Sequence, residues 1–199
     1  MKISFASPSL PKTGAVVVGI KDGKELTSAA SEIDKRTGGA IKRALSSGRF
    51  TGVRGQSLEI VAPAGIGNSR ILLVGLGKGL DELAQQALGG RVYAKMNSVG
   101  ELAATVLLDD GVEDLSAAGA QIAYGARLKS YRFDRYRTKE DSSKKPTLRT
   151  LAIRVDSFAK ARRAFAALDK VSAGVFFTRD LVSAPPNDLY PESFASETK

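Results

Sequence analysis

The sequence predicts an α/β fold in which a mixed, mostly parallel sheet carries helices on both faces. Two observations lead to this prediction. Short runs rich in β-branched residues alternate with longer segments whose apolar residues recur at helical spacing. The runs Ala15–Ile20, Arg70–Gly75 and Thr105–Leu108 are apolar almost throughout, which is typical of strands buried on both faces. A chain of 199 residues can bury roughly 70% of its unfolded surface, so this fold needs no disulfide or metal.

Six short apolar runs are expected to form strands. Turn-forming residues fill positions 63–68, which indicates that the third and fourth runs are a pair of strands joined by a turn. The predicted strands are Lys2–Ala6, Ala15–Ile20, Leu58–Ala62, Arg70–Gly75, Thr105–Leu108 and Thr150–Val155.

Longer segments with helical spacing of apolar residues lie between these strands. The first is broken by Thr37-Gly38-Gly39, so we expect two helices there rather than one. Gly119 and Gly125 lie inside a later segment, where each costs roughly 1 kcal/mol relative to alanine, so we expect close packing against a neighbour. The predicted helical segments are Leu26–Leu45, Leu80–Val99, Leu115–Leu128 and Phe158 to about Val182.

The composition excludes several classes of chemistry. Cysteine and histidine are absent, which rules out a disulfide scaffold, thiol or Ser-His-Asp catalysis, and every metal centre that needs thiolate or imidazole ligands. The 30 basic and 21 acidic residues leave a net charge of +9, which favours polyanionic partners without proving one. We find no secretory signal and no apolar run near the roughly 20 residues of a transmembrane helix, so we expect a cytoplasmic protein with no membrane partner.

The composition changes at Ala184. Pro185 and Pro186 are expected to end the long helix, and Pro191 with Glu192 is expected to begin a new one. A helix that begins so close to Lys199 suggests that the sequence is cut from a longer chain.

Three glycines, Gly75, Gly77 and Gly79, lie between a strand and a helix, which is the context of a phosphate-binding turn. The dinucleotide motif G-x-G-x-x-G would need glycine where Leu80 stands, and no phosphate-loop motif occurs. A tight turn needs glycine without any ligand, so we favour a structural role over phosphate binding.

A strongly basic segment extends from 127 to 149, with nine basic and three acidic residues. Tyr131, Phe133 and Tyr136 are interleaved with its arginines, and aromatics among cations can stack bases while the cations neutralise phosphates. The alternative, which we favour, is a solvated loop that its aromatics anchor to the core. A second basic run, 35–54, would extend the surface if the fold placed the two side by side. The candidate polyanion contacts are Arg132, Arg135, Arg137, Lys144 and Lys145.

Two acidic pairs, Asp109-Asp110 and Glu113-Asp114, follow a predicted strand. Carboxylates at the end of a strand can bind a divalent cation. More often they solubilise a loop or cap a helix, and Asp114 stands where a helix N-cap is expected. We therefore favour the capping role.

The tail resembles a known family. Residues 175–192 read VFFTRDLVSAPPNDLYPE, which is similar to the segment that leads into the catalytic domain of leucyl (cytosol) aminopeptidases. Earlier pieces resemble the amino-terminal domain of that family in the same order, so the resemblance spans essentially all 199 residues. These pieces are Phe50-Thr51-Gly52, Ile71–Gly77, Ala123-Tyr124-Gly125 and Tyr131–Asp134.

The resemblance implies that the complete protein is a metallo-exopeptidase that releases amino-terminal residues from peptide substrates. Such enzymes are cytoplasmic homohexamers with two divalent ions, zinc or manganese, which polarise the scissile carbonyl and activate a bridging water. Several family ligands lie in the motif Asn-Thr-Asp-Ala-Glu-Gly-Arg, which has no counterpart here. We therefore assign no catalytic and no metal-binding residue to this chain, and we expect it to bind no metal and to be inactive alone.

The resemblance also implies three parts: an amino-terminal domain at 1–156, a long linker helix at 157–184, and at 185–199 the start of a catalytic domain that is otherwise absent. The family's amino-terminal domain resembles the macro domain, which binds ADP-ribose in other proteins, although a shared fold does not carry a ligand. Some bacterial members bind DNA. We rank first the interpretation that this chain is the non-catalytic domain of such an enzyme. Two alternatives stay open: second, a DNA- or polyanion-binding module and, third, a nucleotide-binding module at Gly75–Gly79.

Overall fold

Six strands form one sheet in the order β1-β6-β5-β2-β4-β3 in the computed structural model, which describes residues 1–198. Neighbouring strands run parallel except β3, which pairs antiparallel with β4. This arrangement confirms the predicted mixed, mostly parallel sheet. The strands are β1 (Lys2–Ala6), β2 (Ala15–Lys21), β3 (Ser57–Val61), β4 (Arg70–Gly77), β5 (Ala103–Leu107) and β6 (Thr150–Arg154).

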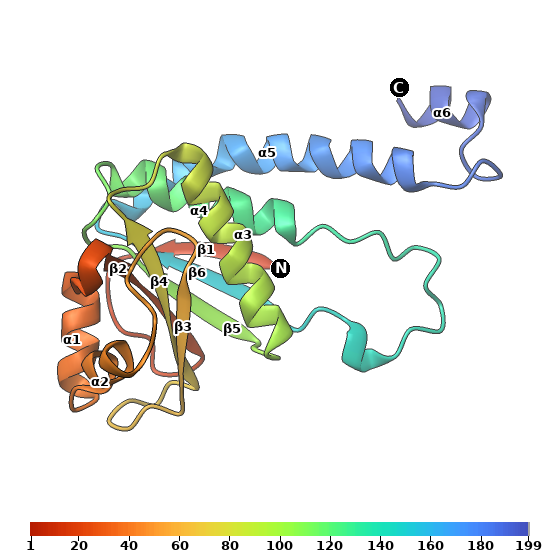
Figure 1. Ribbon diagram of the computed structural model, residues 1–199. Helices are drawn as coiled ribbons and strands as arrows, with labels where there is room; N and C mark the ends of the chain where they lie inside the picture. The colour runs from red at the N-terminus through yellow and green to blue at the C-terminus, as the bar shows by residue number, and fades with distance from the viewer. Residues whose placement is uncertain (199) are drawn as a thin grey trace.

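Helices cover both faces of the sheet, as expected (Figure 1). The predicted break in the first helical segment is confirmed, because Gly38 and Gly39 adopt left-handed φ angles of 60° and 83° there. Short 3₁₀ turns occupy 22–24 and 142–144. The α-helices are α1 (Ser28–Arg36), α2 (Ala40–Ser47), α3 (Glu82–Ser98), α4 (Leu115–Lys129), α5 (Phe158–Ser183) and α6 (Pro191–Glu197).

The central strand β2 separates two hydrophobic cores. Side chains alternate across a strand, so Ala15 and Val17 face one side while Val16 and Val18 face the other. The first pair packs in a core with α3, α4 and the start of α5, and the second packs in a core with α1 and α2. All four side chains are completely buried, which explains why this strand is apolar almost throughout.

Helices α3 and α4 pack at unusually short range through glycines. A Cβ atom at Gly125 of α4 would lie 1.9 Å from the carbonyl oxygen of Gln86 in α3. A Cβ atom at Gly119 would lie 3.2 Å from the Cγ2 methyl of Ile153 in β6. The expected close packing at these two glycines is confirmed.

Helix α5 packs on the domain with its first half and continues past the sheet (Figure 1). Ala161 and Phe165 belong to the core, whereas Val182 near the end of the helix is 82% exposed. Pro191 begins α6, as predicted. Within residues 1–198, no helix is both long enough and apolar enough to span a membrane. The division into parts at 156/157 and 184/185 stays a prediction.

Candidate functional site

The connections of two neighbouring strands diverge at the carboxyl edge of the sheet. After β2 the chain passes through α1 and α2 toward β3 and β4, whereas after β5 it passes through α4 to β6 on the other side. Strands β2 and β5 pair directly. In open α/β sheets, ligands bind in the crevice at the carboxyl ends of such a pair, because the diverging connections leave space there.

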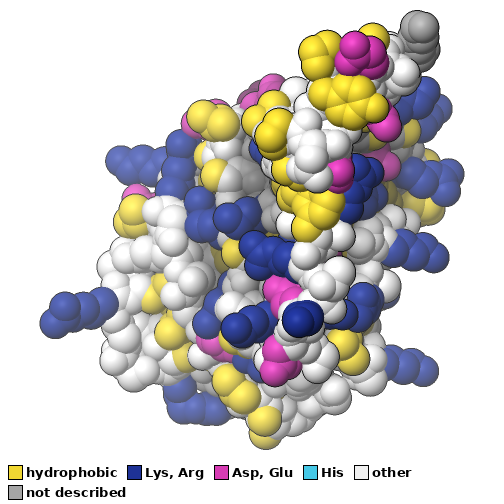
Figure 2. All heavy atoms as spheres, turned by 90° about the vertical axis from the view of Figure 1, so that its right-hand side faces the viewer, with side chains coloured by type: hydrophobic (Ala, Val, Ile, Leu, Met, Phe, Trp, Pro, Cys, Tyr) yellow, Lys and Arg dark blue, Asp and Glu magenta, His cyan; other side chains and the backbone are white. Residues whose placement is uncertain are grey.

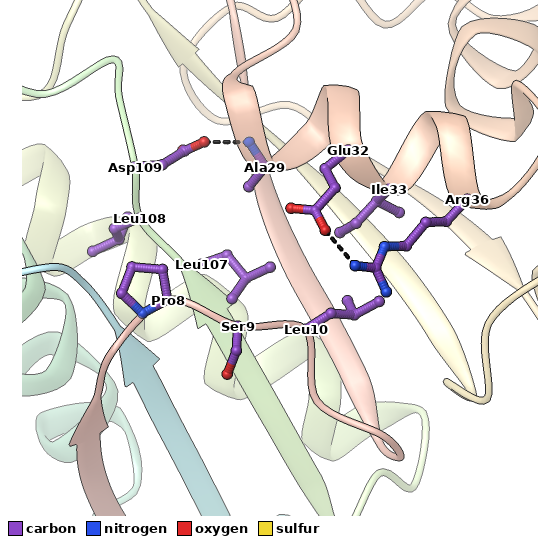
Figure 3. A pocket seen from close by; sticks show the side chains of 10 residues that line it. All are labelled: Pro8, Ser9, Leu10, Ala29, Glu32, Ile33, Arg36, Leu107, Leu108 and Asp109. Atoms are coloured by element: carbon purple, nitrogen blue, oxygen red, sulfur yellow. Dashed lines mark hydrogen bonds and ion pairs between the residues drawn. The ribbon is translucent and has the colours of Figure 1, made fainter.

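A pocket of about 400 Å³ lies at this edge (Figure 3). It is bounded by the segment after β1, by α1 and by the residues that follow β5. Asp109 lies at one end of the pocket, and Glu32 and Arg36 project from α1 along its side. The aliphatic part of the wall is formed by Pro8, Leu10, Ala29, Ile33, Leu107 and Leu108.

Carboxylates from the end of β5 cap the N-terminus of α1. Asp109 accepts a hydrogen bond from the backbone N–H of Ala29, and Oδ1 of Asp110 accepts one from the N–H of Ser28 at 3.2 Å. Asp110 also forms an ion pair with Lys21 at 3.0 Å. The position where a phosphate would meet the N-terminus of a helix is therefore taken by the protein's own carboxylates.

The charged groups of the pocket wall give it an acidic character. Burial raises the pKa of the Asp109 carboxyl, the N–H of Ala29 opposes this shift, and the neighbouring Asp110 charge adds to it. Glu32 and Arg36 form an ion pair at 2.6 Å, with 60% and 53% of their side chains exposed. Two acids and one base line the pocket, so its formal charge is 1 − 2 = −1 in a chain of net charge +9.

The glycine turn lies beside the loop that follows α2. A Cβ atom at Gly75 would lie 2.8 Å from the carbonyl oxygen of Gly52, and the N–H of Gly77 donates to the same oxygen at 2.8 Å. Nε of Arg54 donates to the carbonyl of Gly79 at 2.7 Å. The close backbone approach at Gly75 and the φ of 62° at Gly77 are each sufficient to explain why glycine stands there, whether or not a ligand binds. Phosphate binding at this turn stays a prediction.

The basic segment between α4 and β6 is partly neutralised by its own acid. Arg132 and Arg137 both pair with Glu140, the latter at 3.5 Å, while Nη1 of Arg132 donates to the carbonyl of Lys144 at 3.1 Å. Figure 2 shows acidic side chains among the lysines and arginines of this face. The second basic run, 35–54, lies on the opposite side of the molecule, so the two runs do not form one surface (Figure 1). Polyanion contact by Arg132, Arg135, Arg137, Lys144 and Lys145 stays a prediction.

The aromatic residues of this segment anchor it to α5 and the tail. The rings of Tyr131 and Phe176 lie 5.2 Å apart, and the Tyr131 hydroxyl donates to Asp180 at 2.8 Å. The Tyr136 hydroxyl donates to Asp188. These contacts anchor the segment to the outer half of α5 and to the tail, rather than to the hydrophobic core as predicted.

Three of the four acidic residues after β5, namely Asp109, Asp110 and Asp114, cap helices. Oδ1 of Asp114 accepts the N–H groups of Ser116 and Ala117 at 2.9 and 3.0 Å, which confirms the predicted N-cap of α4. Asp109 and Asp110 serve α1 in the same way. In the described part of the chain, no three acidic side chains gather into a group that could hold a metal ion.

Sequence reasoning missed the residues of α1 that line the pocket. Glu32 and Arg36 are four residues apart, which places both on one side of a helix, but the sequence does not show that this side faces the end of β5. Thr27 was also missed, because the predicted segment began at Leu26, whereas α1 begins at Ser28 with Thr27 as its N-cap. Its hydroxyl accepts the N–H of Ala30 at 3.3 Å and donates to the carbonyl of Gly19 at 3.0 Å.

The fold and the pocket define a three-layer α/β domain with a crevice of ligand size at its switch point. The chain matches the family described as "Cytosol aminopeptidase family, N-terminal domain" across residues 17–140. It therefore belongs to the cytosol aminopeptidase family, as its tail and upstream motifs predicted.

Individual relatives agree with this assignment. A probable cytosol aminopeptidase of Caulobacter vibrioides is 37% identical over 94% of this chain and 38% of its own length, and one of Gluconobacter oxydans is 40% identical over 96% and 38%. A tomato leucine aminopeptidase mutant matches at a TM-score of 0.81 with 26% identity, over 98% of this chain and 41% of that one. The bottromycin maturation enzyme BotP in complex with Mn, at 23% identity and a TM-score of 0.64 over 92% of this chain and 34% of its own, shows the shared fold alone. This chain spans about two fifths of the length of the curated relatives that it matches.

Proposed function

We propose that this chain is the non-catalytic N-terminal domain of a metal-dependent aminopeptidase that releases amino-terminal residues from peptides. The observation that carries the proposal is the match of residues 17–140 to the N-terminal domain of the family. The names of the relatives support an aminopeptidase, hence a hydrolase and protease. Their description as cytosol aminopeptidases also supports a cytoplasmic location, and a homohexamer is the assembly that the family resemblance implies.

The domain's own side chains do not fit a two-metal centre. Asp109 and Asp110 are engaged by the backbone of α1, and Asp114 is engaged by the backbone of α4 and by Lys160 at 3.0 Å. No group of three or more candidate ligands occurs among residues 1–198. The proposal therefore places the zinc or manganese pair and the catalytic groups in the remainder of the parent enzyme, and it assigns no step of the reaction to this chain.

A direct test is an activity assay on the purified chain. We expect no release of nitroaniline from leucine p-nitroanilide in zinc- or manganese-containing buffer, while a cytosol aminopeptidase in the same buffer serves as the positive control. Activity that co-purifies with this chain, identified by its intact mass, would contradict its non-catalytic role. Sequencing the gene downstream of codon 199 tests the parent activity, because an immediate stop codon would contradict it.

A further inference from the structure

We propose that the pocket at the carboxyl ends of β2 and β5 binds a small zwitterion with an aliphatic body, namely an apolar α-amino acid or a dipeptide of such residues. The pocket has about 400 Å³ of space, which is in the range of small-molecule sites. It also lies at the point of the sheet where α/β folds most often bind ligands. The inference rests on the pocket and not on peptidase activity.

The aliphatic wall accounts for the apolar part of the ligand. Leu10, Ile33 and Leu107 approach from three different segments of the chain and converge on one space (Figure 3). Ile33 and Leu107 are 1% and 8% exposed, so the core holds them in place. A branched aliphatic side chain bound against them gains roughly 25 cal/mol for each Å² removed from water.

The charged groups account for the two ends of the ligand. Glu32 and Arg36 place a carboxylate and a guanidinium 2.6 Å apart at the side of the pocket. An α-amino acid carries an ammonium and a carboxylate at similar separation, so it can align its charges antiparallel to this pair, ammonium on Glu32 and carboxylate on Arg36. Asp109 offers a second acceptor for the ammonium at the end of the pocket.

The same groups disfavour a nucleotide or another phosphate ligand. Arg36 is the single basic side chain in the wall, and it is already paired with Glu32. The N-terminus of α1, which would otherwise attract a phosphate, is filled by Asp109 and Asp110. With a formal charge of −1, the pocket repels polyanions although the whole chain is cationic. The chemistry therefore selects a ligand with an ammonium group.

The test is a titration of the ¹⁵N-labelled chain followed by amide chemical shifts. L-leucine and leucyl-leucine should produce saturable shifts at Ala29 and Leu108, and the tighter binder of the two defines the size of the ligand. N-acetyl-leucine lacks the ammonium and leucinamide lacks the carboxylate, so each should bind at least about tenfold more weakly, which corresponds to about 1.4 kcal/mol. ADP-ribose should produce no shifts at these positions.

Three variants of α1 complete the test. Glu32→Gln and Arg36→Gln should each weaken leucine binding at least about tenfold. Both side chains are more than half exposed, so the variants should fold, which their melting temperatures verify. Lys35→Gln is the matched control, because Lys35 is exposed on the same helix and does not line the pocket. The proposal is overturned by the absence of saturable shifts, by an equal loss in the Lys35 variant, by undiminished binding of the blocked leucines, or by ADP-ribose binding at this pocket.

Free amino acids are also the products of the activity proposed above. The two proposals nevertheless fail separately, because the titration needs no catalysis and the activity assay does not depend on this pocket.

Discussion

Gly125 of α4 lies against α3 so closely that a Cβ atom there would fall 1.9 Å from the carbonyl oxygen of Gln86. The relationship is reciprocal, because a Cβ atom at Gly89 of α3 would fall 1.8 Å from the carbonyl oxygen of Ile122. Neither clash involves a flexible side chain, so one helix would have to move away from the other.

Replacement of Gly125 by alanine therefore tests the helix contact. We expect Gly125→Ala to lower the free energy of unfolding by about 2 to 3 kcal/mol, because overpacking outweighs the gain in helix propensity. Gly90→Ala is the matched control. Its Cβ atom would lie an ordinary 3.6 Å from the carbonyl oxygen of Gly125, so its stability should stay equal or rise by up to about 1 kcal/mol. Urea denaturation measures both, and equal effects would contradict the contact.

Arg70, the first residue of β4, joins two partly buried glutamates. It pairs with Glu59 and, at 2.5 Å, with Glu101, and all three side chains are less than 20% exposed. We expect Arg70→Met to lower the free energy of unfolding by about 3 kcal/mol, because it leaves the carboxylates without their shared cation. Lys95→Met removes a more exposed partner of Glu59, 2.8 Å away, and should cost less than about 1 kcal/mol. A similar midpoint for both variants in urea would refute this ranking.

The N-cap of α4 gives the domain an acid-sensitive element. The N–H of Ala117, followed by Lys160, holds the pKa of Asp114 below its usual range. A lowered folded-state pKa contributes stability above the ordinary aspartate pKa, and this contribution is lost as pH falls through the lowered value. Asp114→Asn keeps a good N-cap that does not titrate there. Between about pH 5 and pH 2.5, the melting temperature of the variant should therefore fall less steeply than that of the wild type. Parallel curves would exclude a role for this carboxylate.

Glu140 holds the basic segment together. Arg132 lowers the pKa of this carboxyl, and Glu140 is 10% exposed while it contacts both Arg132 and Arg137. We expect Glu140→Gln to speed trypsin cleavage within 131–149 several-fold, because the ion pairs that restrain the segment weaken. Asp134→Asn is the control, since Asp134 is 61% exposed and lies 4.0 Å from Arg132. Unchanged cleavage of the Glu140→Gln variant, measured by mass spectrometry, would show that the segment is restrained by its aromatic contacts instead.

The fold could be predicted from the sequence because each element has a local signature. The apolar run of β2 is buried on both faces, and the glycines at 38 and 39 mark the break between α1 and α2. The predicted end of β4 was less accurate. The prediction stopped at Gly75, but the strand extends to Gly77, because Lys21 of β2 pairs with Gly77 across a register shift and loop 52–56 accepts hydrogen bonds from Gly75 and Gly77. Both partners come from other parts of the sequence, so no local pattern marks the extension.

The pocket depends on contacts between distant segments, which is why the sequence did not reveal it. Asp109 and Ala29 are 80 positions apart, and only the order of strands in the sheet brings them together. The glycine turn and the basic segment are conspicuous in the sequence because the residues of each lie within one short stretch. The pocket residues Glu32 and Arg36 are ordinary surface residues of a helix until the end of β5 lies beside them.

The 26 residues of α5 make a rod about 39 Å long that continues past the sheet (Figure 1). Tyr131 holds the far end of this helix through Asp180, and Tyr136 holds the tail through Asp188. The position of α6 therefore depends on the basic segment as well as on the sheet. One residue added to the exposed half would advance α6 by about 1.5 Å and turn it by about 100°. The length of α5 is therefore constrained. An insertion keeps the orientation of α6 only if it adds close to a whole number of helical turns.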